Sequence, residues 1–193
     1  NTLDGKTSVA INASNITTLT GAAADLNSAY ASSGISNLGN EAVTLADITL
    51  SASVLNTLDG RTSGTINASN ITTLTGSAAD LNTAYTSSGI SNLGNEAVTL
   101  ADTSLAVSVL NTLDGRTSGT INANSINTLT GSAADLNTAY TSGGISNLGN
   151  EAVTLSDTSL AASVLNTLDG RTSGAINASN INTLTGTAAD LNT

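Results

Sequence analysis

The fold is decided by the stretch Asn56–Leu110, which reads NTLDGRTSGTINASNITTLTGSAADLNTAYTSSGISNLGNEAVTLADTSLAVSVL. It recurs at 111–165 with six substitutions in 55 positions, and 1–55 matches it with ten. Repetition at a fixed period is typical of architectures in which each unit packs mainly against its neighbours. We therefore expect one continuous repeat array over 1–193, with units 1–55, 56–110, 111–165 and a partial unit 166–193. Since the array starts and stops within a unit, we expect it to be a fragment of a longer chain or fibre.

The substitutions between copies avoid the large aliphatic positions. Most changes between the second and third copies exchange small or polar residues, such as Ser88 for Gly143 and Ala101 for Ser156. Leu58, Leu74 and Leu81 recur at every step that the chain covers. This bias indicates a core that is rebuilt in each unit. Recent duplication is the alternative, and it explains the identity but not the bias.

The composition favours a solenoid over a compact globule. The chain contains no Phe, Trp, Met, Pro, Cys or His, and only three Tyr. A globule with so few bulky side chains would be hard to pack without voids. Thin stacked coils need only a few inward aliphatic residues each. Disorder is disfavoured because 39% of the residues are apolar and regularly placed.

Each 55-residue unit divides into two related halves, Val43–Asn70 and Ile71–Ala97, which predicts two coils of 27–28 residues. In the first half we predict a helix over 102–113, with Asp102 as N-cap and Gly115 in the left-handed position after its end. Leu105, Val109, Leu110 and Leu113 form its apolar stripe. We expect Leu105, Val109 and Leu113 to be buried, and Arg116 and Thr117 to be exposed.

In the second half, Ser77-Ala-Ala-Asp80 resembles a capping box with Asp in place of Glu. Ala78, Leu81 and Tyr85 line one face of the helix that it predicts, and Gly89 ends that helix. The first copy has Ala22 at the position of Ser77, which weakens the cap there.

The β-branched segments Ile66–Ala68, Ile71–Leu74 and Ala97–Leu100 are predicted strands. The predicted fold is thus an α/β repeat solenoid of 27–28-residue coils, two per 55-residue unit, with short parallel strands and short helices. An all-β solenoid, in which the Ala/Ser-rich segments are also extended, is the alternative. Strand pairing should join equivalent positions one half-repeat apart, for example around Leu74 and Leu100.

Four asparagines, Asn67, Asn70, Asn92 and Asn95, lie where a coil must turn a corner. Stacked Asn side chains could hydrogen-bond along the axis as a ladder. Alternatively, Asn is simply a favourable turn residue.

Composition also limits the chemistry. Without Cys or His the chain lacks thiol and imidazole catalysis, disulfides and the usual zinc sites, so we predict no enzyme and no catalytic residues. A net charge of −10 disfavours nucleic acid and anionic lipid. No apolar run approaches the roughly 20 residues of a membrane span. We predict no cofactor and no metal site; calcium is the one alternative, with isolated candidates Glu96, Asp102, Asp59 and Asp80 and their copies.

The phrases LNTLDGRTSGTINAS, TTLTGSAADLNTAY and SGISNLGNEAVTL resemble repeats of very large secreted cell-surface proteins of marine unicellular cyanobacteria. The resemblance covers the whole chain and implies an extracellular, cell-surface location with a structural or adhesive role. The favoured function is a structural segment of a filament or surface layer that self-associates end to end or laterally. The alternative is an adhesin or binding stalk that contacts glycans or another cell surface. Regular repeats favour the first, because a dedicated site would show as one deviant unit.

Overall fold

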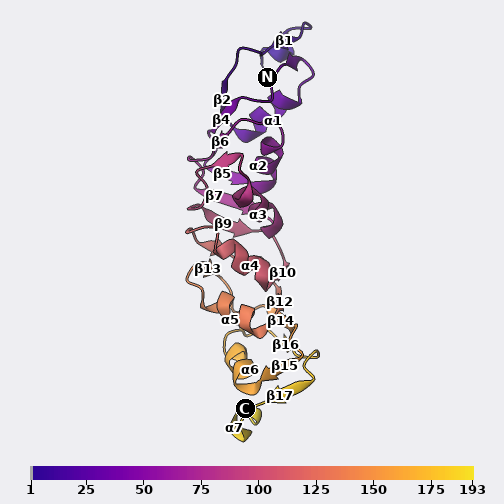
Figure 1. The fold of residues 1–193 in the computed structure, drawn as a ribbon, viewed down its shortest axis with the longest axis vertical. Helices are drawn as coiled ribbons and strands as arrows, with labels where there is room; N and C mark the ends of the chain where they lie inside the picture. Colours follow the sequence, from indigo (N-terminus) through magenta and orange to yellow (C-terminus); the bar gives the residue numbers. More distant parts are fainter. Residues whose placement is uncertain (1) are drawn as a thin grey trace. The chain divides into compact units, whose positions relative to one another are not determined.

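The computed structural model describes residues 2–193 and contains two compact units, Asn1–Ala97 (unit 1) and Val98–Thr193 (unit 2). Both units are α/β, and both are built from short helices and short parallel strands that recur in a fixed order (Figure 1). The α/β prediction is confirmed. The all-β alternative is wrong, because the Ala-rich segments are helical.

The helices alternate between two kinds. Those that begin with Ala-Ala-Asp-Leu are α1 (Ala23–Ala31), α3 (Ala78–Thr86), α5 (Ala133–Thr141) and α7 (Ala188–Leu191). Those that end in Leu-Asn-Thr-Leu-Asp are α2 (Ala52–Asp59), α4 (Val107–Asp114) and α6 (Ala162–Asp169). A short 3-10 helix, η1 (Asp4–Lys6), precedes them. Consecutive helices of a unit contact one another, α1 to α3 in unit 1 and α4 to α7 in unit 2.

Each complete repeat contributes five short strands. Those with Ile-Asn are β1 (Ile11–Asn12), β6 (Ile66–Asn67), β11 (Ile121–Asn122) and β16 (Ile176–Asn177). Those with Thr-Leu-Thr are β2 (Thr18–Gly21), β7 (Thr73–Gly76), β12 (Thr128–Gly131) and β17 (Thr183–Thr185). Those with Ile-Ser are β3 (Ile35–Ser36), β8 (Ile90–Ser91) and β13 (Ile145–Ser146). Those with Ala-Val-Thr-Leu are β4 (Ala42–Leu45), β9 (Ala97–Leu100) and β14 (Ala152–Leu155). The last kind, before α2, α4 and α6, comprises β5 (Thr49–Ser51), β10 (Ser104–Ala106) and β15 (Ser159–Ala161).

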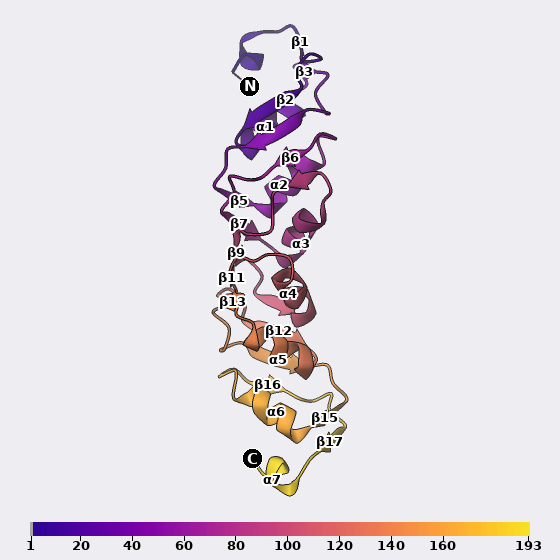
Figure 2. The same cartoon turned by 60° about the vertical axis from the view of Figure 1, so that its left-hand side comes forward.

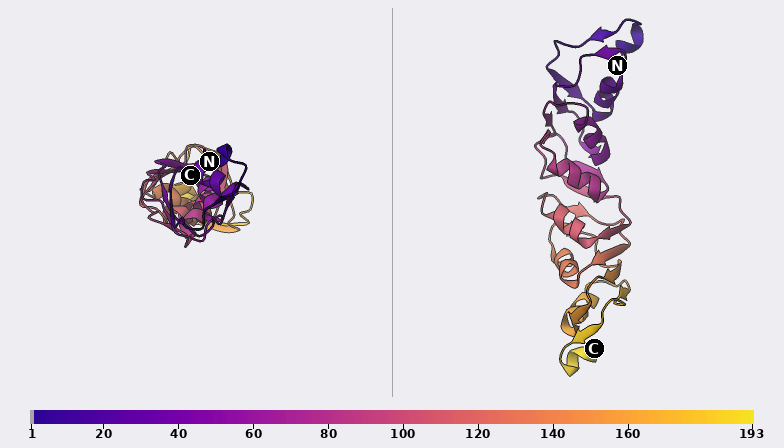
Figure 3. Two further views of the ribbon diagram at one scale, coloured as in Figure 1. Left: turned by 90° about the horizontal axis from the view of Figure 1, so that it is seen from above. Right: turned by 45° about the vertical axis from the view of Figure 1, so that its right-hand side comes forward.

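The strands of each unit form parallel sheets opposite the helices (Figures 2 and 3). Within unit 1 the strands pair in the orders β1-β3, β2-β4-β6-β8 and β5-β7, and within unit 2 they pair in the orders β9-β11-β13, β10-β12-β14-β16 and β15-β17. The expected offset of one half-repeat is wrong, because paired residues lie 24 positions apart, or 23 where an Ala-Val-Thr-Leu strand precedes an Ile-Asn strand. Leu74 pairs with Leu50, for example, and Leu129 with Val153.

The shorter offset changes the number of residues between each strand of a sheet and the helix that follows it. Because 24 residues is less than the 27–28 of a half-repeat, each added strand lies a few residues further from the helix that follows it. Strand β10 ends directly before α4, whereas β16 begins at residue 176, 12 residues before α7 at residue 188. A sheet therefore ends after a few strands, and a new one begins beside each second helix.

The core lies between helices and strands and is mostly Leu and Ala. Leu110 and Leu113 of α4 are fully buried, whereas Leu105 and Val109 are half-buried, so that part of the predicted stripe is wrong. For Leu105 the reason is that residues 104–106 form strand β10, and the helix begins only at Val107. In the second half, Ala78 and Leu81 of the predicted face are buried, whereas Tyr85 is half-buried.

Two predicted helix ends are also wrong. Gly115 is right-handed, with φ −72° and ψ −5°, and its N–H bonds to the carbonyl of Asn111. Helix α3 ends at Thr86, before Gly89. The expected exposure of Arg116 and Thr117 is wrong too, because both are half-buried.

Candidate functional site

The acidic residues that the sequence offers as calcium ligands are dispersed and take part in internal hydrogen bonds. Asp59 Oδ2 accepts a 2.7 Å hydrogen bond from the hydroxyl of Ser87. Asp80 completes the predicted capping box: the Ser77 hydroxyl donates to its carboxylate at 2.8 Å and accepts from its N–H at 3.1 Å. Among residues 2–193, no three metal-binding side chains of the His, Cys, Asp or Glu type come together.

The prediction that Asp102 is the N-cap of the helix in its own half-repeat is wrong, because the residue before that helix is Ala106. The Asp102 copies Asp47 and Asp157 each accept a 2.8 Å hydrogen bond from the first N–H of a helix 24 residues earlier, at Ala23 and Ala133. A carboxylate there satisfies an unpaired amide and opposes the positive end of the helix dipole. Sequence reasoning missed the partner because it lies in the preceding half-repeat.

A buried carboxyl anchors the Asn-Leu-Gly-Asn-Glu loop of each complete repeat. Glu41, Glu96 and Glu151 are at most 1% exposed. Glu41 Oε2 accepts hydrogen bonds from the N–H groups of Gly39 at 2.8 Å and Asn40 at 3.2 Å. In the next copies the tyrosine hydroxyl donates to the same carboxylate oxygen, from Tyr85 at 3.3 Å and from Tyr140 at 3.2 Å.

The Glu41 carboxyl and the Tyr140 phenol, which belong to two copies of this cluster, both have shifted pKa values. Burial by itself raises the pKa of the Glu41 carboxyl, but the backbone hydrogen bonds of the loop and the interaction with Tyr30 outweigh it, so its pKa is lowered. Burial, first, and then the nearby Glu151 carboxylate raise the pKa of Tyr140 to about 12, against the opposing effect of Thr172. At neutral pH the carboxylate of Glu41 is therefore a fixed acceptor, and the phenol of Tyr140 is a fixed donor.

The predicted Asn ladder is present only as isolated pairs. Asn92 has a positive φ of 63°, a conformation that Asn tolerates better than most residues, and its side-chain NH₂ donates to Asn67 Oδ1 at 2.8 Å. Asn70 instead donates to the backbone carbonyl of Leu45 at 2.7 Å. The sequence thus located the corner residues but not their partners.

A second set of asparagines, on the helices, was not predicted. Each donates from its side-chain NH₂ to a backbone carbonyl of the next helix: Asn27 to Val54, Asn56 to Asp80, Asn111 to Asp135 and Asn166 to Asp190, at 2.9–3.1 Å. These positions recur every half-repeat, which was the signal available in the sequence.

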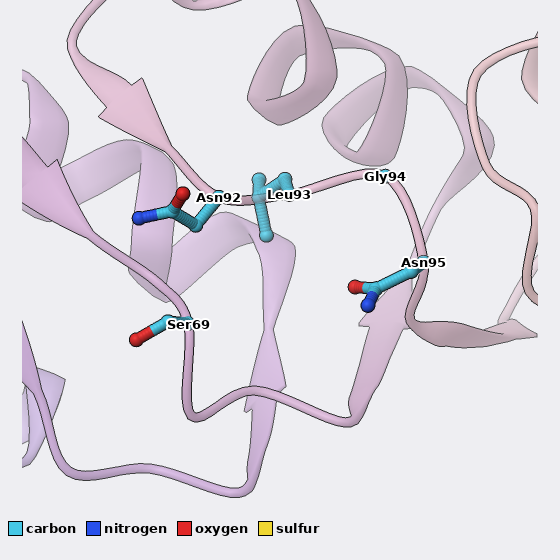
Figure 4. Close-up of a pocket in the computed structure, with 5 residues that line it drawn as sticks. All are labelled: Ser69, Asn92, Leu93, Gly94 and Asn95. Carbon is cyan, nitrogen blue, oxygen red and sulfur yellow. The ribbon is translucent and has the colours of Figure 1, made fainter.

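An open polar groove lies beside the same loop. Ser69, Asn92, Leu93, Gly94 and Asn95 line a cavity of about 430 Å³ in unit 1. Figure 4 shows Leu93 and Asn95 projecting into the space between their loop and the segment that carries Ser69. The equivalent positions in unit 2 line a cavity of about 290 Å³; they are Asn124, Asn147, Leu148, Gly149 and Asn150. The groove is thus a recurring feature, whereas the sequence predicts Asn92 and Asn95 only as corner residues, in a ladder or in a turn.

No helix in the described part of the chain is long and apolar enough to cross a membrane. Comparison with known protein families, with curated proteins and with solved structures returns no match to this chain.

Proposed function

We propose that the chain is a solenoid segment with a structural role in an extracellular filament or cell-surface layer, and that it is not an enzyme. The observation that carries the proposal is the repetition of the contacts between half-repeats. Asn70 and Asn180 donate to the carbonyls of Leu45 and Leu155, in each case 25 residues earlier, at 2.7 and 2.8 Å. The third copy has Ser125 at this position. Asn56, Asn111 and Asn166, however, repeat one bond to the next helix in three consecutive repeats, and such repetition suits an array of indefinite length.

The solenoid geometry makes a measurable prediction. Parallel pairing advances the chain by one strand spacing, about 4.7–4.9 Å, for every 23–24 residues. Helices usually pack 8–10 Å apart, but small side chains at the contact allow closer approach. Ala78 and Ala84 of α3 are buried, which supports spacing set by the strands. Fibre diffraction from the concentrated protein should show a meridional reflection near the strand spacing. A strong axial repeat near 20 Å without a strand reflection would contradict this geometry.

Self-association, end to end or laterally, belongs to the same proposal. Because each half-repeat contacts mainly its neighbours, the contacts that join neighbours within a chain can also join two chains. Sedimentation at increasing concentration should therefore show association, whereas a monomer at every concentration would argue against it.

The extracellular location rests on the resemblance to secreted cyanobacterial surface repeats. Immunogold labelling of source cells with antibodies against this chain tests it directly. Label along surface fibres or a continuous layer is expected. Label confined to the cell interior would contradict the location, and label only on isolated spikes would favour the adhesin alternative.

A further inference from the structure

The groove beside each Asn-Leu-Gly-Asn-Glu loop offers more polar groups than the fold uses. The side chains of Ser69 and Asn95 are exposed, and within residues 2–193 neither makes a side-chain hydrogen bond. Asn92 uses its NH₂ group on Asn67, which leaves its carbonyl oxygen available. These groups supply several donors and acceptors around one cavity.

Two hydrogen bonds hold the loop that carries these groups in place. The N–H of Gly94 donates to the carboxylate of the buried Glu96 at 2.8 Å. The bond from Asn92 to Asn67 fixes the other end of the loop. Because the groove is already ordered, a ligand would lose little affinity to loop ordering.

The two copies of the groove offer the same kinds of hydrogen-bonding groups, although one of their lining residues differs. Asn124 in the third copy replaces Ser69, so a hydroxyl is exchanged for an amide that also donates and accepts. Leu93 and Leu148 are both half-buried and add an apolar surface to each groove. Within the described chain, no charged side chain lines either cavity.

We propose that these grooves bind uncharged carbohydrate. Amides and hydroxyls that each donate and accept suit the vicinal hydroxyls of a sugar, and a leucine suits its C–H face. The net charge of −10 disfavours acidic glycans. The volumes of about 430 and 290 Å³ suit short segments of a chain rather than a large ligand. This inference goes beyond the structural role and does not depend on it.

A single open groove should bind weakly, with a Kd on the order of 1 mM. Two grooves on one chain can bind a polysaccharide more tightly than either alone, provided that it reaches both. The proposal therefore predicts stronger retention of long neutral polymers than of their short oligomers.

The test is an NMR titration of the ¹⁵N-labelled chain with maltohexaose, cellohexaose and mannohexaose as separate probes. At least one should shift the backbone signals of 92–95 and 147–150 and the side-chain amides of Asn95 and Asn150. The double variant Asn95→Ala, Asn150→Ala should weaken that binding at least about tenfold. The matched control is Thr83→Ala, Thr138→Ala, which changes exposed helix residues outside the groove lining and should bind as the parent does.

Circular dichroism of both double variants establishes that they fold like the parent. The proposal is overturned if no neutral probe shifts these signals at about 10 mM. It is also overturned if the shifts lie elsewhere, if the asparagine variant binds like the control, or if only anionic polysaccharides bind.

Discussion

The hydroxyl of Thr62 donates a 2.9 Å hydrogen bond to the backbone carbonyl of Glu41, 21 residues earlier in the chain. Both residues are buried, and the same hydroxyl accepts the N–H of Gly64 at 3.0 Å. A Cβ atom at Gly64 would collide with that carbonyl of Glu41. The close approach of two neighbouring half-repeats therefore depends on a glycine at this position, and Gly174 makes the same approach to Glu151.

Gly64→Val should therefore destabilise the chain by about 1–3 kcal/mol, the usual cost of overpacking. The first copy already has valine here, at Val9, and that side chain is 74% exposed. Urea unfolding of the whole chain measures the loss. Gly143→Ser is the control, since a Cβ there meets nothing within 4 Å and the second copy has Ser88 at that position. Equal midpoints for the two variants would contradict the close approach.

Glu41 should make stability depend on pH in the acid range. Its pKa is lowered in the folded state relative to the ordinary 4.5, so its contribution is present above that value and is lost as the pH falls through the folded pKa. Glu41→Gln should therefore destabilise the chain at neutral pH, with the gap to the parent narrowing below about pH 4.5. Urea midpoints across this range measure the gap. A gap that stays constant down to about pH 3 would count against an ionised Glu41 in the fold.

Tyr140 should make the stability of the chain fall as the pH rises in the alkaline range. Its pKa is raised from 10.0 to about 12, so its contribution is complete below pH 10 and is lost as the pH rises toward about 12. Tyr140→Phe removes this ionisation and should flatten the decline in stability between these values. Denaturant unfolding and the phenolate absorbance of the folded chain follow it. An ordinary pKa for all three tyrosines would contradict the partly buried hydrogen bond from Tyr140 to Glu151.

The sequence predicts the local elements better than their pairing. The capping box at Ser77 and Asp80 is confirmed because both partners lie within one helical turn, where spacing determines contact. The strand offset was wrong because internal similarity aligns residues 27–28 apart, whereas backbone pairing joins Leu74 to Leu50. Two strands can pair wherever their inward side chains match, and they need not be copies of one another.

The helix start at Val107 was missed for a related reason. Leu105 fits both an apolar stripe of helical period and a short alternating strand, and periodicity alone cannot distinguish the two. The groove was missed because it depends on two loops from successive half-repeats, which carry Ser69 and Asn95. None of the residues that line the groove is charged or aromatic, so none of them marks it in the sequence.

Leu110→Ala should cost more than Leu105→Ala. Leu110 is fully buried, so its loss should cost about 2–5 kcal/mol, whereas the half-buried Leu105 should cost clearly less. Because each half-repeat contacts mainly its neighbours, the loss of amide protection should be confined to those around α4. Hydrogen exchange with residue resolution measures both effects. Loss of protection through the whole chain, or a larger effect at Leu105, would contradict this assignment of the core.

Exchanging one residue between two copies tests the capping box with the chain as its own control. Ser77 and Ala22 are equivalent positions with nearly the same backbone, at φ −70° and −69°, but only Ser77 makes a side-chain cap bond. Ser77→Ala should cost about 0.5–2 kcal/mol, and Ala22→Ser should gain a similar amount, because Asp25 occupies the position of Asp80. The double exchange should then restore the parent's stability to within about 0.5 kcal/mol, since the two helices are distinct sites. Denaturant unfolding of the three variants measures this. If Ala22→Ser gains nothing, then Asp47, which already accepts the N–H of Ala23, is sufficient to cap α1 and the local box is redundant there.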